Sequence, residues 1–169
     1  MMAIASNRFP SSARRWTPAN GESLLYRPRR YADDSVPSGA GVAAQVLLTL
    51  GHLLAEPKYL DAADTVLHAA WPEMQRAPEA HASFLRALQS FVEPPSLVVL
   101  RGSSTISDWA KEVARVSPDA GIVQLDENVE AEALQRYAAK DDAVAYVCQG
   151  TACSAPIDNL EELINSFGE

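Results

Sequence analysis

Glu93-Pro94-Pro95-Ser96-Leu97-Val98-Val99-Leu100 is the stretch at which the hydrophobic pattern of this chain changes. Before the two prolines, apolar residues recur every three or four positions, as on one face of a helix. The prolines end that helical pattern, and the uninterrupted apolar run Leu97–Leu100 is typical of a buried strand. The sequence therefore predicts an α+β protein, helical before this stretch and mixed after it.

Three helices are expected before the prolines. The first starts at Ser38, which can act as its N-cap, and its apolar residues are Val42, Val46, Leu47, Leu50, Leu53 and Leu54. Ala43, Ala44 and Leu48 lie off that stripe, so this helix is expected to need neighbours on more than one side. The second helix begins at Pro57 and is expected to stop near Pro72. The third runs from about Pro78 to Val92. The short connection at Glu56 favours an antiparallel hairpin of the first two helices.

Strands and helices alternate after Pro95. Strands are predicted at 97–100, 122–125 and 143–148, and helices around 106–113, 129–137 and 160–167. Asp158 and Glu161 have the spacing of a capping box for the last helix. Such alternation predicts a small three-strand parallel sheet with right-handed crossovers. We therefore divide the chain into an irregular lead-in (1–37), helical hairpins (38–95) and an α/β module (96–169).

Composition and charge exclude several partners. The chain has 169 residues and a net charge of −8, but residues 1–30 carry six arginines against one glutamate. The remaining residues are strongly acidic, which phosphate repels, so no nucleic-acid partner is predicted. No apolar run approaches the roughly 18 residues of a membrane helix, so no membrane association is predicted. Two cysteines are too few for a secreted disulfide scaffold, which favours a cytoplasmic location.

Three stretches together resemble one family. They are 33–44 with the following Leu50-Gly51-His52-Leu53-Leu54, then 94–102, and finally Ala145-Tyr146-Val147-Cys148-Gln149-Gly150-Thr151-Ala152-Cys153-Ser154-Ala155-Pro156. In order and spacing they resemble the C-terminal end of the spermatogenesis-associated, thioredoxin-domain-containing proteins, over roughly residues 20–169. The resemblance implies a thioredoxin-like domain and an α/α toroid, related to N-acylglucosamine epimerases and six-hairpin glycosidases, ahead of a small α/β tail.

The same resemblance implies that this chain holds the last helices of an incomplete toroid, followed by the tail. Residues 1–19 depart from the family pattern. Ala40 stands where the family usually has Asn, so any ligand contact of that amide is lost here. The thioredoxin-like domain is absent from this chain, and its redox activity cannot be carried over.

Asp33, Asp34 and Ser38 form the first candidate site, at the entrance to the first helix. Carboxylates at a helix N-terminus are stabilised by the helix dipole, and Ser38 can cap, which is the structural interpretation. In the functional interpretation the two carboxylates act as acid and base on a sugar in a toroid cavity.

Cys148 and Cys153 form the second candidate site. We predict that both are reduced and inert, with Cys148 buried on the third strand and Cys153 more accessible in a loop. Under oxidising conditions the two cysteines can form a disulfide if their Cα atoms lie within about 7 Å. The alternative interpretation is a functional redox pair. Two cysteines without a nearby histidine cannot complete a zinc site.

The remaining polar residues carry weaker signals. Gly102-Ser103-Ser104-Thr105 lacks the spaced glycines and the lysine of a phosphate loop, so an ordinary turn is predicted there. His52, His68 and His81 lie on separate helices without metal-ligand spacing, and no cofactor is predicted.

Two hypotheses of function follow. The first is a non-catalytic structural or interaction fragment of a thioredoxin-domain, toroid-containing protein, whose partner is the missing N-terminal part or a second copy of the chain. The alternative is part of a sugar-active enzyme, similar to epimerases or glycosidases, whose toroid is completed by another segment.

Overall fold

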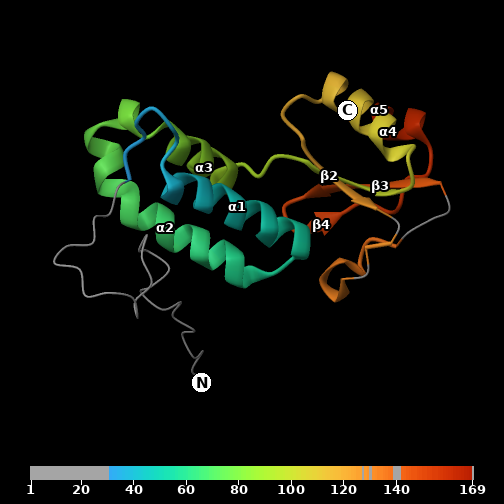
Figure 1. Ribbon diagram of the computed structural model, residues 1–169, viewed down its shortest axis with the longest axis horizontal. Helices are drawn as coiled ribbons and strands as arrows, with labels where there is room; N and C mark the ends of the chain where they lie inside the picture. The colour runs from blue at the N-terminus through green and yellow to red at the C-terminus, as the bar shows by residue number, and fades with distance from the viewer. Residues whose placement is uncertain (1–30, 127, 130, 139–141, 169) are drawn as a thin grey trace. The chain divides into compact units, whose positions relative to one another are not determined.

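A computed structural model describes residues 31–126, 128–129, 131–138 and 142–168 of the chain (Figure 1). The expected basic segment and most of the expected lead-in lie outside these residues. The chain divides into two compact units, which we call the helical unit (1–48 and 58–89) and the α/β unit (49–57 and 90–169). The boundary cuts helix α1, whose last turns belong to the α/β unit.

The helical unit contains α1 (Gly39–Leu54) up to Leu48, most of α2 (Pro57–Arg76), a 3-10 turn (Pro78–Ala80) and most of α3 (Ala82–Val92). The sequence predicts all three helices, although it places the start of the third at about Pro78 and α3 begins at Ala82. Their core consists of small and large apolar side chains that interlock, namely Ala44, Leu48, Ala63, Leu67, Ala70, Met74, Phe84 and Ala87. The alanines allow the helix backbones to approach closely while the larger side chains fill the remaining space.

The chain reverses between α1 and α2 through a Schellman motif. The amide of Glu56 donates to the carbonyl of Gly51 at 3.1 Å, and the amide of Ala55 donates to that of His52 at 3.3 Å. Ala55 has the left-handed φ of 51° that this motif requires. Pro57 then occupies the first position of α2, where its missing amide proton is not needed. The predicted hairpin of the first two helices follows from this turn (Figure 1).

Pro72 does not end the second helix, so that prediction is wrong. Helix α2 continues through Pro72 to Arg76. A proline inside a helix costs about 3 kcal/mol because it removes a hydrogen bond and crowds the preceding turn. Met74, which follows the proline, is only 2% exposed in the core, and burying a methionine contributes about 1.5–3 kcal/mol. Core packing on the far side of Pro72 therefore offsets much of that cost.

The α/β unit is built on a four-stranded sheet in the order β2-β1-β3-β4. Strand β1 (Leu97–Gly102) is parallel to β2 (Gly121–Asp126), and α4 (Ile106–Val116) connects them. Strand β3 (Ala143–Gln149) is antiparallel to β1, with Leu97 opposite Cys148, and β4 (Ala152–Cys153) is antiparallel to β3. The positions of β1, β2 and β3 confirm the predicted strands, whereas β4 occupies residues predicted to be a loop. The prediction of a wholly parallel sheet is wrong.

The direction of β3 follows from the segment that precedes it. A helix was predicted around 129–137, but the regular structure described there is the 3-10 turn Glu132–Leu134. The guanidinium of Arg101, on β1, donates to the carbonyl of Val129 at 2.7 Å and to that of Tyr137 at 2.5 Å. These two carbonyls therefore accept hydrogen bonds from a side chain that is distant in the sequence. The described residues between β2 and β3 contain no crossover helix, and the chain enters β3 antiparallel to β1.

Two apolar layers cover the sheet. On one face α4 and α5 (Leu160–Asn165) pack through Trp109, Val113 and Leu163 against Val98 and Leu100. On the other face Tyr137, Leu125 and Tyr146 surround Val99 and Cys148. Strand β1 is buried along its whole length because both layers meet it.

The N-terminus of α5 is capped by Asn159, whereas the sequence predicts Asp158 as the cap. The side-chain oxygen of Asn159 accepts hydrogen bonds from the amides of Glu161 at 2.8 Å and Glu162 at 3.3 Å. Asn159 directly precedes the first helical residue, Leu160, and has an extended backbone, which is the conformation an N-cap residue adopts. The N-cap is therefore one residue later than the sequence predicts.

Candidate functional site

Asp33 joins the N-termini of two helices. Its Oδ1 accepts a hydrogen bond from the amide of Ser38 at 2.7 Å, and its Oδ2 accepts one from the amide of Ser83 at 2.8 Å. The hydroxyl of Ser83 also donates to Oδ1. Ser38 precedes α1 and Ser83 lies in the first turn of α3, so one carboxylate supplies acceptors to both helix starts.

Ser38 is the N-cap that the sequence predicts for α1. Its Oγ accepts from the amide of Gly41 at 3.1 Å and lies 3.2 Å from Oγ of Ser83. Ser38 and Ser83 are both buried, and together with Asp33 they form a closed set of hydrogen bonds. We call these three residues the Asp33 cap.

The chemistry of Asp33 fits capping better than acid catalysis. Burial, the largest single influence, raises the pKa of its carboxyl, but hydrogen bonds from Ser83 and Ser38, with the nearby His81, together outweigh it. The pKa is therefore below the ordinary value of 3.8. A general acid at neutral pH needs a raised pKa. Asp34 is exposed, and the structure gives it no place in the Asp33 cap.

Cys148 and Cys153 are joined by a disulfide with an S–S distance of 2.06 Å. The prediction that both thiols are reduced is therefore wrong for this structure. The two residues face each other directly across β3 and β4, and their Cα atoms are 3.9 Å apart, within the limit set for a disulfide. The predicted burial of Cys148 and the greater exposure of Cys153 are both confirmed.

Arg136 and Tyr137 complete the surroundings of the disulfide. Nη2 of Arg136 lies 3.4 Å from Sγ of Cys153 and donates to the carbonyl of Thr151 at 3.0 Å. The hydroxyl of Tyr137 lies 3.9 Å from Sγ of Cys148 and 3.8 Å from Sγ of Cys153. It also donates to the carbonyl of Leu53, in the part of α1 that belongs to the α/β unit, at 2.8 Å.

The electrostatics of this second site differ from those of the Asp33 cap. Burial raises the pKa of Tyr137, and the positive charge of Arg136 opposes that rise only in part, so the phenol is neutral at physiological pH. The guanidinium of Arg136 also lies 5.3 Å from the centre of the Tyr137 ring, a cation–π distance. Sequence reasoning missed both residues because they lie in a segment that was predicted to be helical.

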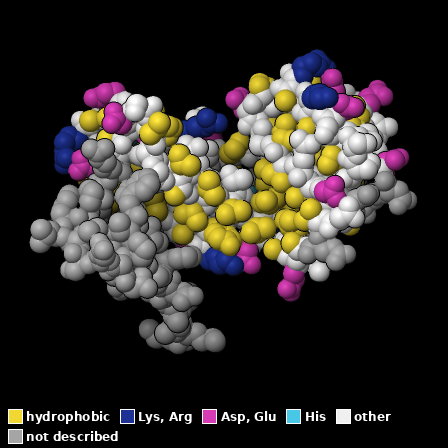
Figure 2. Space-filling model, viewed as in Figure 1, with side chains coloured by type: hydrophobic (Ala, Val, Ile, Leu, Met, Phe, Trp, Pro, Cys, Tyr) yellow, Lys and Arg dark blue, Asp and Glu magenta, His cyan; other side chains and the backbone are white. Residues whose placement is uncertain are grey.

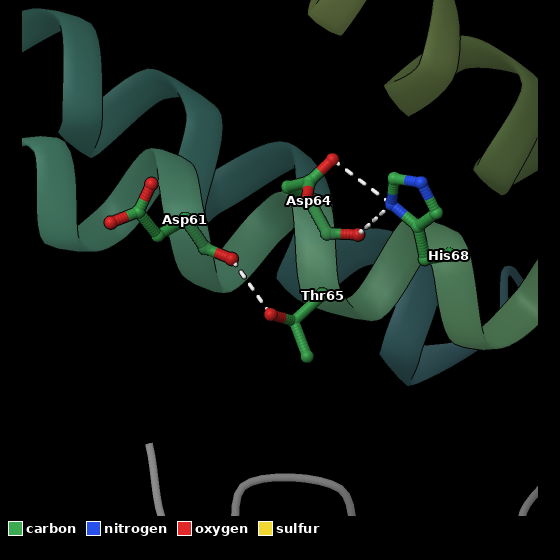
Figure 3. A network of polar contacts seen from close by, with 4 residues as sticks. All are labelled: Asp61, Asp64, Thr65 and His68. Atoms are coloured by element: carbon green, nitrogen blue, oxygen red, sulfur yellow. Dashed lines mark hydrogen bonds and ion pairs between the residues drawn. The ribbon is translucent and has the colours of Figure 1, made fainter. Parts of the chain in front are cut away.

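The three histidines occupy separate environments. His68 is exposed, and its Nδ1 lies 3.0 Å from Oδ1 of Asp64 and 3.1 Å from the Asp64 carbonyl, beside the Thr65–Asp61 hydrogen bond (Figure 3). His81 is buried, with Nδ1 2.8 Å from the carbonyl of Ala77. Neither ring nitrogen of His52 has a hydrogen-bond partner in the described part of the chain, and burial lowers the pKa of this histidine.

The turn Gly102-Ser103-Ser104-Thr105 uses its amides inside the protein. The amide of Ser103 donates to the carbonyl of Asp142 at 3.1 Å, and that of Ile106 donates to the carbonyl of Ser103 at 3.3 Å. This is the ordinary turn that the sequence predicts. Among the described residues, no group of three or more His, Cys, Asp or Glu side chains could hold a metal ion.

Fold and sites together define an α+β chain of two units, with a carboxylate cap in the helical unit and an edge disulfide in the α/β unit. The sequence is 28% identical over 156 residues to human spermatogenesis-associated protein 20. The match covers 85% of this chain but 20% of the human protein, so the chain spans about a fifth of the relative's length. It supports a distant resemblance to that protein. No family model and no solved structure matches the chain.

None of the helices in the described ranges is long and apolar enough to cross a membrane.

Proposed function

We propose that this chain is a non-catalytic structural and interaction module, which packs as the C-terminal part of a larger protein similar to spermatogenesis-associated protein 20. In this proposal α1–α3 are the last helices of an α/α toroid, the α/β unit is the tail, and the assembly is cytoplasmic. Two observations support it: the match covers most of this chain but a fifth of the relative, and α1 presents apolar side chains to solvent.

The outer face of α1 is the observation that carries the proposal. The helix has 16 residues and not one Asp, Glu, Lys or Arg among them. Val42 is 43% exposed and Val46 50% exposed, and their spacing of four places them on the same side. Figure 2 shows hydrophobic side chains at the surface of the helical unit.

The neighbouring helix shows what a solvated face looks like in this protein. On α2 the exposed positions include the charged residues Asp61, Glu73 and Arg76, with Trp71 as an exposed apolar side chain among them. An outer face that is apolar over successive turns supports the proposal of an interaction surface there. We call Val42 and Val46 the α1 stripe.

The occupant we propose for the α1 stripe is an apolar helix from the remaining part of the larger protein. The relative is about five times as long as the region matched here, which leaves ample chain to supply such a helix. Both partners would bury aliphatic side chains, at about 25 cal/mol for each Å² removed from water. Because the stripe is uncharged, the association should depend only weakly on salt.

The Asp33 cap favours this structural role over the sugar-active alternative. A glycosidase-like site needs an acid and a base that face one ligand. Both oxygens of Asp33 already accept hydrogen bonds from the protein. Because its pKa is lowered, the carboxyl group is ionised at neutral pH and has no proton to donate.

The test is a binding experiment with a matched pair of variants. The source organism's polypeptide that corresponds to the rest of the relative is produced separately and titrated with this chain by calorimetry. Val46→Lys places a charge in the stripe and should weaken the complex at least tenfold. Thr65→Lys places the same charge on an exposed, polar position of α2 and should change the affinity less than twofold.

Three results would overturn the proposal. One is the absence of a complex with the wild-type chain at micromolar concentration. Another is equal binding by the Val46→Lys and Thr65→Lys variants. A dimer of the chain alone that Val46→Lys dissociates would replace the proposed occupant by a second copy. A thermal shift with millimolar sugars, by contrast, would support the enzyme alternative.

A further inference from the structure

We propose that Cys148 and Cys153 form a thiol–disulfide exchange site. Cys153 exchanges with an external thiol, and Arg136 stabilises the Cys153 thiolate. Cys148 is the leaving group when the disulfide is reduced and the resolving cysteine when it forms again. The co-reactant is a low-molecular-weight thiol with its disulfide, of the glutathione class. The inference does not depend on the proposed docking of the helical unit.

Accessibility separates the two sulfurs. Cys148 lies on β3 in the apolar layer beneath Tyr137 and has no exposed surface. Cys153 ends β4, a strand of two residues at the edge of the sheet, and is partly exposed. A thiolate must reach a sulfur along the axis of the disulfide bond, so an external thiolate can attack only at Cys153.

Arg136 supplies the charge that makes Cys153 a competent thiolate. Its guanidinium lies 3.4 Å from Sγ of Cys153, and an adjacent cation lowers a cysteine pKa. The carbonyl of Thr151 and the ring of Tyr137 hold the guanidinium in that place. Because Arg136 is exposed, solvent screens part of its effect, and we expect a shift of about one pKa unit, the low end for an opposite charge.

Tyr137 suits the buried cysteine in the reduced state. Its single hydroxyl proton is donated to the carbonyl of Leu53, which leaves the oxygen lone pairs available as acceptors. With this oxygen 3.9 Å from Sγ of Cys148, the thiol that forms on reduction has an acceptor for its own proton. Cys148 can thus remain a neutral thiol inside the apolar layer.

The exchange proceeds in two displacements. An external thiolate attacks Sγ of Cys153, a new S–S bond forms, and the electron pair of the broken bond goes to Sγ of Cys148, which takes up a proton from water. A second external thiolate then attacks the external sulfur of this mixed disulfide. It releases Cys153 as a thiolate beside Arg136 and leaves as the small-molecule disulfide. Two external thiols are oxidised and one protein disulfide is reduced.

The experiment uses the full chain and mixtures of reduced and oxidised glutathione. Acid-quenched mass spectrometry follows the native protein, and we expect reversible interconversion of the disulfide and dithiol forms at millimolar glutathione. Cys148→Ser should take up one glutathione from oxidised glutathione through Cys153. Cys153→Ser should react at least tenfold more slowly while folded, and as fast as Cys148→Ser in denaturant.

A variant that removes the charge of Arg136 tests its role through the pH dependence of the reaction rate. A purely structural role would leave this pH dependence unchanged. Adding Arg136→Gln to Cys148→Ser should shift the pH–rate profile upward by about one unit. At neutral pH the thiolate fraction would fall about tenfold while its nucleophilicity rises about threefold, so the rate should fall about threefold. If Cys148→Ser does not fold, peptide mapping of the mixed disulfide trapped on the wild-type chain gives the same assignment.

A disulfide that resists millimolar glutathione in the folded chain would overturn the proposal and make the bond purely structural. Equal reaction of both single-cysteine variants in the folded state would overturn the order of the two cysteines. An unchanged pH–rate profile in the Arg136→Gln variant would overturn the role of the arginine.

Discussion

Asp33→Ala should destabilise the helical unit at two helix ends at once, because one carboxylate serves both. The substitution removes the acceptors for the amides of Ser38 and Ser83 and for the Ser83 hydroxyl. His81, the residue that precedes α3, does not replace it, because its Nδ1 lies 2.8 Å from the carbonyl of Ala77. Asp33 itself is anchored by its own amide, which donates to the carbonyl of Ala80 at 2.7 Å.

The magnitude follows from counting helix ends. Loss of an N-cap acceptor costs about 1 kcal/mol per helix. A hydrogen bond to a charged group contributes about 1.5–3 kcal/mol when both partners are withdrawn from water, and Ser83 is buried. Asp33 is partly exposed, so water replaces some of the lost acceptors. We therefore expect a loss of about 2–3 kcal/mol, which is roughly a 30- to 150-fold change in the unfolding equilibrium.

Native-state hydrogen exchange measured by mass spectrometry is the suitable assay, because the two units can open separately. Peptides from α1 and α3 should lose protection in Asp33→Ala, while Asp34→Ala, which changes the exposed neighbour, should stay within about 0.5 kcal/mol of wild type. The lowered pKa of Asp33 means that its contribution is complete above pH 3.8 and is lost as the pH falls through the folded-state pKa. The wild type should therefore approach the variant in acid. Equal protection in the two variants at neutral pH would refute the capping argument.

Three further substitutions test other parts of the fold. Gly41→Ala would place its Cβ 2.2 Å from Oγ of Ser83, so chemical denaturation should show a loss of about 1–3 kcal/mol from overpacking, despite the gain of about 1 kcal/mol in helix propensity. Arg101→Met should raise hydrogen exchange in residues 129–137 at least tenfold and leave the sheet protected, because it removes the donors to that segment's carbonyls. The pKa of His52 is lowered, so the free energy of unfolding of the α/β unit should be highest above pH 6.5 and should fall as the pH drops below that value. Urea titrations of His52→Leu should lack this decline. An equal decline in the variant would contradict the assignment to His52.

The elements that sequence reasoning predicted correctly are those whose signals are local. Ser38 begins α1 because a hydroxyl three residues before an amide can cap it, and the structure shows that bond to Gly41. The strand at Leu97 follows from an apolar run bounded by Pro95. In each case the physical cause lies within a few residues of its effect.

The errors arose where a distant residue decides the local structure. Residues 129–137 have helical spacing of apolar side chains. However, Arg101 donates hydrogen bonds to the carbonyl of Val129, 28 residues further along the chain, and to that of Tyr137, 36 residues further along. Pro72 lies inside α2 because Met74 packs against side chains of α1 and α3, and this burial offsets much of the cost of the proline. The Asp33 cap needs Ser83, fifty residues further along the chain, and no pattern in the sequence links the two.

The disulfide is a different case, because its signal is local and lies in the spacing of the two cysteines. The usual spacing of a redox pair is Cys-x-x-Cys at a helix N-terminus, and Cys148 and Cys153 do not have it. In a hairpin with a two-residue loop, the loop is flanked by one directly opposed pair, and the next pair outward is five positions apart. Gly150 takes the left-handed φ of 61° in that loop, so Cys148 and Cys153 face each other as this count requires. On such a hairpin no helix dipole is available to activate a thiol, so the activating charge must come from a side chain. The structure places Arg136 in that position.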